Sequence, residues 1–151
     1  MPQPTPGAAY RPALAIALGA IAGSLCRYFL GAWLNQSFSL DPPYSTLIVN
    51  VSGCFLMGIL ATLSLDDAIR LHPEMRLLLL TGFLGSYTTF SSYELDSAKL
   101  LQQKGLTADL TYWLGSVMLG FTALRLGIIL TEWILSRFAS QDQCLEDIHS
   151  N

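Results

Sequence analysis

Long apolar blocks dominate the chain, and they lack the one-sided spacing of an amphipathic helix in a soluble protein. Three of them, at about 13–34, 46–65 and 110–135, reach the roughly 20 residues that a helix needs to cross about 30 Å of hydrocarbon. A fourth block, 77–101, is long enough but carries many polar residues. The pattern predicts an all-α membrane protein with four transmembrane helices joined by short loops.

The polar stretch GFLGSYTTFSSYELDS, residues 82–97, interrupts the third predicted span soon after a run of leucines. Non-helical backbone is tolerated at membrane depth only where protein or water satisfies its polar groups. Broken helices also mark ion sites in membrane proteins. The stretch therefore predicts that the third helix is broken near its middle, and that the break belongs to an ion site.

Hydrogen-bond donors and aromatic rings gather at this predicted break. Four hydroxyl side chains lie within 88–92, among them Ser91 and Ser92. Phe90 and Tyr93 are three residues apart, so their rings should project to one side of the following helix. Aromatic rings have positive edges. Because the first two spans contain no acidic residue, ring edges and hydroxyl donors favour a path for an anion over one for a cation.

Polar side chains also recur at helical spacing on the second and fourth spans. Thr46 and Asn50 are four residues apart and share one helical face. Tyr112, Ser116 and Gly120 repeat the same step along the fourth span. An asparagine in such a position can equally hold helices together, with a hydrogen bond of about 0.6 to 2 kcal/mol. The spacing alone leaves both roles open.

The first span combines small residues with a buried charge. Ala15, Gly19 and Gly23 recur every four residues, a spacing that lets helix backbones approach closely. Arg27 follows four residues later. A charge at this depth costs several kcal/mol unless it faces protein or water. Arg27 therefore either lines a polar vestibule or extends toward the loop at Asn35.

The ends of the chain suggest three parts. Residues 1–12 are rich in proline and are expected to form a disordered lead, 13–138 the four-helix membrane domain, and 139–151 a polar tail. Lysines and arginines flanking the spans favour one side of the membrane by only two residues, which is compatible with insertion in both directions. A bundle this thin cannot enclose a wide aqueous pore by itself, so an oligomer is expected.

Composition argues against several other classes of protein. The chain is 52% apolar, 13% charged and carries a net charge of −3, and no nucleic-acid partner is expected. Cys26, Cys54 and Cys144 show no C-x-x-C spacing and no neighbouring histidine, so neither a disulfide framework nor a metal site is indicated. No nucleophile, base and orienting group occur at usable spacing, and an enzyme is not expected.

Three segments together resemble the Fluc (CrcB) family of fluoride channels. They are GAIAGSLCRY at 19–28, STLIVNVSGCFLMG at 45–58 and GFLGSYTTFSSYELD at 82–96, in the family's order and spacing within about 13–135. The resemblance implies a passive channel in the bacterial inner membrane that exports cytoplasmic fluoride down its electrochemical gradient and lowers fluoride toxicity. It also implies an antiparallel, dual-topology homodimer, surrounded by lipid, with two narrow pores.

The resemblance assigns roles to individual residues. The backbone carbonyls of Gly85 and Thr88 would hold a structural sodium ion at the dimer centre, and Gly85 is expected to have unusual backbone dihedrals there. Arg27 matches the arginine that ends the family's first-helix motif. The fluoride pore is expected to be lined by eight residues: Thr46, Asn50, Phe90, Ser91, Ser92, Tyr93, Tyr112 and Ser116.

The chain departs from the family pattern at three positions. Tyr93 stands where the family has a second pore phenylalanine, so the ring edge is kept and a hydroxyl is added. Ser86 replaces the commoner second glycine of the break. Gly120 stands where the family often continues the polar track of the fourth helix with another hydroxyl.

Two functions of other classes stay open on the sequence alone. A small proton-coupled exporter of organic cations would also have four short spans and dual topology, but it needs a carboxylate in the membrane, and the first span offers Arg27 instead. A membrane subunit that transports nothing would explain the apolar bulk but not the polar break. Fluoride flux from liposomes that contain only the purified protein would separate a channel from such a subunit.

Overall fold

The computed structural model describes residues 6–40, 42–66 and 71–149, and within these ranges all regular secondary structure is helical. The long helices are α1 (Pro6–Phe38), α2 (Tyr44–Leu65) and α6 (Leu106–His149). Between α2 and α6 the chain forms four shorter elements: α3 (Pro73–Arg76), the π-helix η1 (Leu77–Leu84), α4 (Gly85–Tyr87) and α5 (Phe90–Lys104). The all-α prediction is confirmed.

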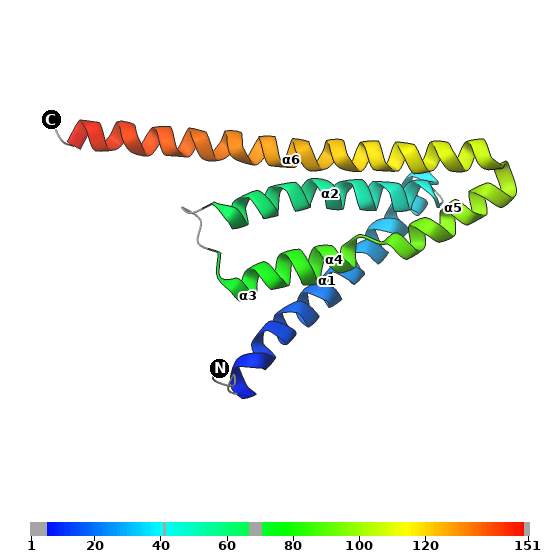
Figure 1. Cartoon of the computed structure of the whole chain (residues 1–151), viewed down its shortest axis with the longest axis horizontal. Helices are drawn as coiled ribbons and strands as arrows, with labels where there is room; N and C mark the ends of the chain where they lie inside the picture. Colours follow the sequence, from blue (N-terminus) through cyan, green and yellow to red (C-terminus); the bar gives the residue numbers. More distant parts are fainter. Residues whose placement is uncertain (1–5, 41, 67–70, 150–151) are drawn as a thin grey trace, which may run out of the picture.

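The helices run in alternating directions along the length of the molecule (Figure 1). The beginning of α1, the end of α2, the beginning of α3 and the end of α6 lie toward one end. The end of α1, the beginning of α2, the end of α5 and the beginning of α6 lie toward the other end, and α1 crosses the rest at a steep angle. Helix α6 packs most extensively on α2, and α1 on η1. The segment from α3 to α5 therefore runs the length of the bundle as a single broken helix.

Among the described residues, three helices are long and apolar enough to cross a membrane: Tyr10–Phe38, Tyr44–Leu65 and Leu106–Arg137. They coincide with the three uninterrupted spans that the sequence predicted. Large apolar side chains are exposed along α1 and α6, including Leu18, Phe29, Phe121 and Trp133. Such surfaces are suited to hydrocarbon and not to water, and the chain is accordingly a multi-pass integral membrane protein.

Both ends of the chain are more helical than the sequence indicated. Helix α1 begins at Pro6 and contains Pro12, so the expectation of no helix before residue 13 is wrong for 6–12. Proline fits the first helical position because N–H groups have no helical partner there. Residues 1–5 of the predicted lead lie outside the described residues. Helix α6 continues to His149, so the polar segment extends the last helix as far as that residue.

Glycines bring helix backbones together at two crossings. A Cβ added to Gly19 or Gly23 of α1 would collide with backbone carbonyl oxygens of η1. Gly58 of α2 and Gly127 of α6 form the second crossing, where a Cβ on either residue would collide with a carbonyl oxygen of the opposite helix. The first crossing confirms the close packing predicted from small-residue spacing. The second was not predicted from the sequence.

Candidate ion-conduction site

The third helical segment breaks at Thr88 and Thr89. Both residues have extended backbone, with φ −76° and ψ 157° at Thr88 and φ −146° and ψ 120° at Thr89. Gly85 has ordinary helical dihedrals, φ −62° and ψ −26°, so the expectation of unusual dihedrals there is wrong. The physical reason is that two β-branched threonines, which favour extended backbone, form the break three residues beyond that glycine.

The side-chain amide of Asn50 holds the backbone of Thr89. Asn50 Nδ2 donates to the Thr89 carbonyl oxygen at 3.0 Å, and the Thr89 N–H donates to Asn50 Oδ1 at 2.8 Å. One side chain from α2 thus satisfies both backbone polar groups of a residue that has left the helix. Unsatisfied groups at membrane depth would cost several kcal/mol each, so this pair stabilises the break.

The two carbonyls expected to bind sodium have lost their helical donors. In a continuous α-helix, the N–H of Thr89 would donate to the carbonyl of Gly85, and that of Ser92 to the carbonyl of Thr88. Here Thr89 N–H donates to Asn50, and Ser92 N–H donates to Thr89 Oγ1 at 3.2 Å. The Asn50 amide and the Thr89 hydroxyl therefore free the carbonyls of both residues.

Gly85 and Thr88 line a cavity of about 720 Å³ on an uncovered face of the chain, which we call the break face. Arg27 and Ser91 line it as well. Gly85 is exposed, and an added Cβ would meet nothing within 4 Å. The polar groups of the break face are thus not covered by the chain itself.

A second cavity, the vestibule, lies between α1, α2 and α5 and measures about 470 Å³. Its lining includes Arg27, Asn35, Thr46 and Ser92. Arg27 is half-buried and has no acidic partner within ion-pair distance in the part of the chain that the structure describes. Asn35 lines the same cavity. The two interpretations of Arg27 from the sequence, a polar vestibule and an extension toward Asn35, therefore refer to the same cavity.

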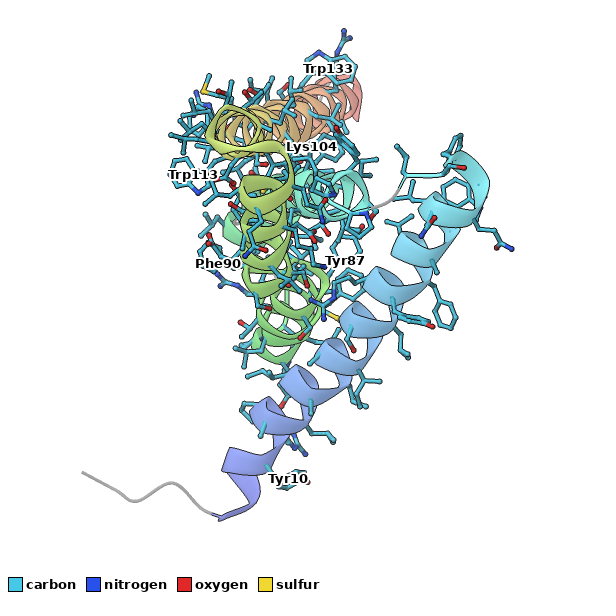
Figure 2. The ribbon with its side chains drawn as sticks, turned by 90° about the vertical axis from the view of Figure 1, so that its right-hand side faces the viewer. Tyr10, Tyr87, Phe90, Lys104, Trp113 and Trp133 are labelled. Carbon is cyan, nitrogen blue, oxygen red and sulfur yellow. The ribbon has the colours of Figure 1, made fainter. Side chains whose placement is uncertain are left out.

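The third cavity, also about 470 Å³, is the aromatic chamber between α2, α5 and α6. Asn50, Phe90, Tyr93 and Ser116 line it. The ring centroids of Phe90 and Tyr93 are 6.1 Å apart, and Tyr93 stacks on Tyr112 at 5.0 Å. The three rings form a row that runs from Tyr112 through Tyr93 to Phe90 and leads toward the surface. Tyr93 is 7% exposed, whereas Phe90 is 74% exposed and lies on the outer side of α5 (Figure 2).

Thr89 lines all three cavities and therefore lies at their junction. Its Oγ1 is within 3.4 Å of the Ser91 hydroxyl and donates to Ser92 Oγ at 3.1 Å. Ser91 lines the break face and Ser92 the vestibule, whereas Tyr93 lines the chamber and Phe90 lines both the chamber and the break face. Hydroxyl groups and aromatic rings, which the sequence suggested for one path, are thus distributed among the three cavities around Thr89.

Several hydroxyls of the expected pore are already engaged. Thr46 Oγ1 donates to Asp96 Oδ2 at 2.7 Å, and Ser116 Oγ donates to the Tyr112 carbonyl oxygen at 2.6 Å. The Tyr112 hydroxyl makes a long contact of 3.4 Å with the carbonyl oxygen of Pro43. Each of these protons has an acceptor within the chain, so the corresponding side chains shape the site more than they offer free donors.

Asp96 is a site residue that the sequence analysis did not single out. The residue is 5% exposed, and its carboxyl accepts the hydrogen bond from Thr46. The available signal was its position three residues after Tyr93 and four after Ser92, which places it on their side of α5. The neighbouring Ser97 donates to Asp109 Oδ1 and so ties α5 to the start of α6.

These features define a small, all-helical membrane protein that is built around a polar helix break. Residues 14–128 match the sequence profile of the CrcB-like proteins, described as "CrcB-like protein, Camphor Resistance (CrcB)". The chain belongs to this family. The matched region contains α2 and the whole broken segment, together with most of the apolar parts of α1 and α6.

Curated relatives share much of the sequence. The chain is 47% identical over 128 residues to the "Fluoride-specific ion channel FluC" of Trichormus variabilis, covering 85% of this chain and 90% of that protein. It is 51% identical over 120 residues to the protein of the same name from a Synechococcus strain, covering 80% of this chain and 92% of the relative. Each match spans nearly the full length of the relative.

Proposed function

We propose that the chain forms a passive fluoride channel of the bacterial inner membrane and crosses that membrane four times. The observation that carries this proposal is the junction at Thr89, where Asn50 holds a broken helix open between three cavities. Relatives of similar length carry the name of a fluoride-specific ion channel. Export of fluoride down its gradient would lower its toxicity to the cell.

The charges and donors around Thr89 suit a small anion. Arg27 places a positive charge at the vestibule, where it attracts anions and opposes cations. Asn50 has a second N–H beyond the one given to Thr89, and it lines the aromatic chamber. Ring edges of Phe90 and Tyr93 continue the positive lining. An anion passing Thr89 would exchange water for these groups step by step.

A second copy of the chain, in antiparallel orientation, would complete the site. Phe90 is 74% exposed, and the break face presents Arg27, Gly85 and Ser91 outside the single chain. Charged side chains and free carbonyls are not stable against lipid. A homodimer would cover them, and the weak lysine and arginine bias permits subunits of opposite orientation.

The carbonyls of Gly85 and Thr88 fit a structural sodium ion at the centre of that dimer. Their helical donors are bound to Asn50 Oδ1 and Thr89 Oγ1, so the oxygens are left without these partners. Neutral carbonyl oxygens are hard ligands suited to a hard cation. Two residues from each subunit would supply four such oxygens, and the ion would hold the two breaks together without carrying current.

Efflux from liposomes containing only the purified protein tests the proposed function. Fluoride should leave such liposomes once a counter-ion path is opened, whereas chloride should be retained. Loss of both anions at the same rate would indicate an unselective pore, and retention of both would favour the structural subunit. A fluoride signal that requires a proton gradient would instead favour a coupled exporter.

A further inference from the structure

The hydroxyl of Tyr93 is buried in the aromatic chamber without a hydrogen-bond partner among the described residues. The Ser116 hydroxyl approaches it without completing a hydrogen bond. Buried hydroxyls are almost always bonded, because leaving one unpaired costs free energy. The other such group, on Ser64, lines none of the three cavities. The Tyr93 hydroxyl is therefore a buried, unpaired donor on a side chain that lines a cavity.

The side chains around Tyr93 hold its ring in place. The ring is stacked on Tyr112 at 5.0 Å on one side and lies 6.1 Å from Phe90 on the other. It belongs to a buried cluster with Leu100 and Tyr112. A ring packed between neighbours cannot turn its hydroxyl freely toward solvent, so the position of the donor is fixed before any ligand arrives.

Several other polar groups of the chamber have committed protons. Ser116 Oγ donates to the Tyr112 carbonyl oxygen, and one Asn50 N–H donates to the Thr89 carbonyl oxygen. The donors that no described residue accepts include the second N–H of Asn50, the O–H of Tyr93 and the indole N–H of Trp113, a residue that is 47% exposed. A group that accepts hydrogen bonds and carries no donor, as a monoatomic anion does, fits between two donors of this kind.

We propose that the Tyr93 hydroxyl is a ligand for the conducted anion and donates a hydrogen bond to fluoride in the aromatic chamber. This inference rests on the proposed channel function and adds to it a contact that a phenylalanine could not provide. Hydrogen bonds to an ionised acceptor are shorter and stronger than neutral ones. Fluoride concentrates its charge in a smaller ion than chloride, so the contact favours fluoride.

Tyr93→Phe tests the proposal because it removes the hydroxyl and keeps the ring. The half-saturating fluoride concentration is measured for efflux from liposomes and for the fluoride-dependent rise in the thermal unfolding midpoint of the purified full chain. We expect Tyr93→Phe to raise both concentrations about tenfold, as loss of one hydrogen bond to a charged ligand implies. Tyr87→Phe is the matched control, since that buried hydroxyl is paired with Ser52 at 2.8 Å.

The control should keep the wild-type fluoride dependence. If Tyr93→Phe also keeps it, the hydroxyl is not an anion ligand. A change in the unfolding midpoint without fluoride, at unchanged fluoride dependence, would point to bound water and would equally overturn the proposal. Absence of fluoride flux from the wild-type protein would instead contradict the proposed function, so the two failures can be told apart.

Discussion

Asn50 makes contacts that its place on α2 does not reveal. On the sequence it is a polar residue on the Thr46 face, suited either to an anion or to holding helices together. In the structure its oxygen and one N–H are bound to the backbone of Thr89. Only the second N–H can reach an anion in the aromatic chamber. Asn50 therefore holds the break, and under the proposed function it would also offer one donor to the path beside it.

Asn50→Asp should lower fluoride flux about tenfold or more. The new carboxylate can still accept from Thr89 N–H, but it cannot donate to the Thr89 carbonyl oxygen, and it places negative charge at the anion path. Flux from liposomes measures the effect, with Gln102→Glu as a control that adds the same charge at an exposed position of α5. Near-wild-type flux through a folded Asn50→Asp protein would contradict both roles.

Residue roles that depend on helical spacing could be predicted, and roles that depend on a partner could not. Spacing put Thr46 and Asn50 on one face because the geometry of a helix is local. Their partners, Asp96 and Thr89, lie 50 and 39 residues away. These contacts depend on how α2 packs against α5, which no pattern within either helix specifies.

At the scale of the helices, the broken segment could also be predicted only in part. The mixture of glycine, hydroxyl and aromatic residues predicted a break within 82–92, and the structure has it at Thr88 and Thr89. No pattern in the sequence predicted that 77–84 is a π-helix, because a run of leucines does not distinguish the wide turns of a π-helix from ordinary α-helical turns. Such π segments occur often at functional sites, and this one leads directly into the break.

Gly127→Val should separate α6 from α2. A Cβ at Gly127 would collide with the carbonyl oxygen of Phe55, and a branched side chain cannot avoid backbone atoms. We expect a loss of about 1–3 kcal/mol in the free energy of unfolding, as for other overpacked sites. Denaturant unfolding in detergent measures it. Gly115→Val is the control on the same helix, since a Cβ there meets nothing within 4 Å, and equal losses in both variants would contradict the crossing.

At the scale of the whole molecule, the uncovered break face leads to a prediction about assembly. Subunits of a dual-topology homodimer insert in both orientations, so a tag on either terminus should be labelled from both faces of the membrane. The weak charge bias of the chain permits this. A tag that is found on only one face in every copy would rule out the antiparallel arrangement.

Replacement of sodium by a large organic cation should lower both fluoride flux and the thermal unfolding midpoint of the purified protein. The reason is that the carbonyls of Gly85 and Thr88 would lose the sodium ion proposed to bridge them, and unpaired carbonyls are costly inside a membrane protein. Thr88→Ser should respond to sodium as the wild type does, since the ligand is a main-chain atom. Sodium uptake driven by a fluoride gradient would show that the ion is transported and not structural.

The central claim is that the protein conducts fluoride passively and selectively, and the voltage at which net fluoride movement stops tests it most directly. Liposomes holding a fluoride gradient are clamped at a series of potentials with potassium and an ionophore, while chloride and proton gradients are varied independently. The account predicts that movement stops at the equilibrium potential of fluoride, whatever the other two gradients. A stopping potential that follows the proton or the chloride gradient would contradict it.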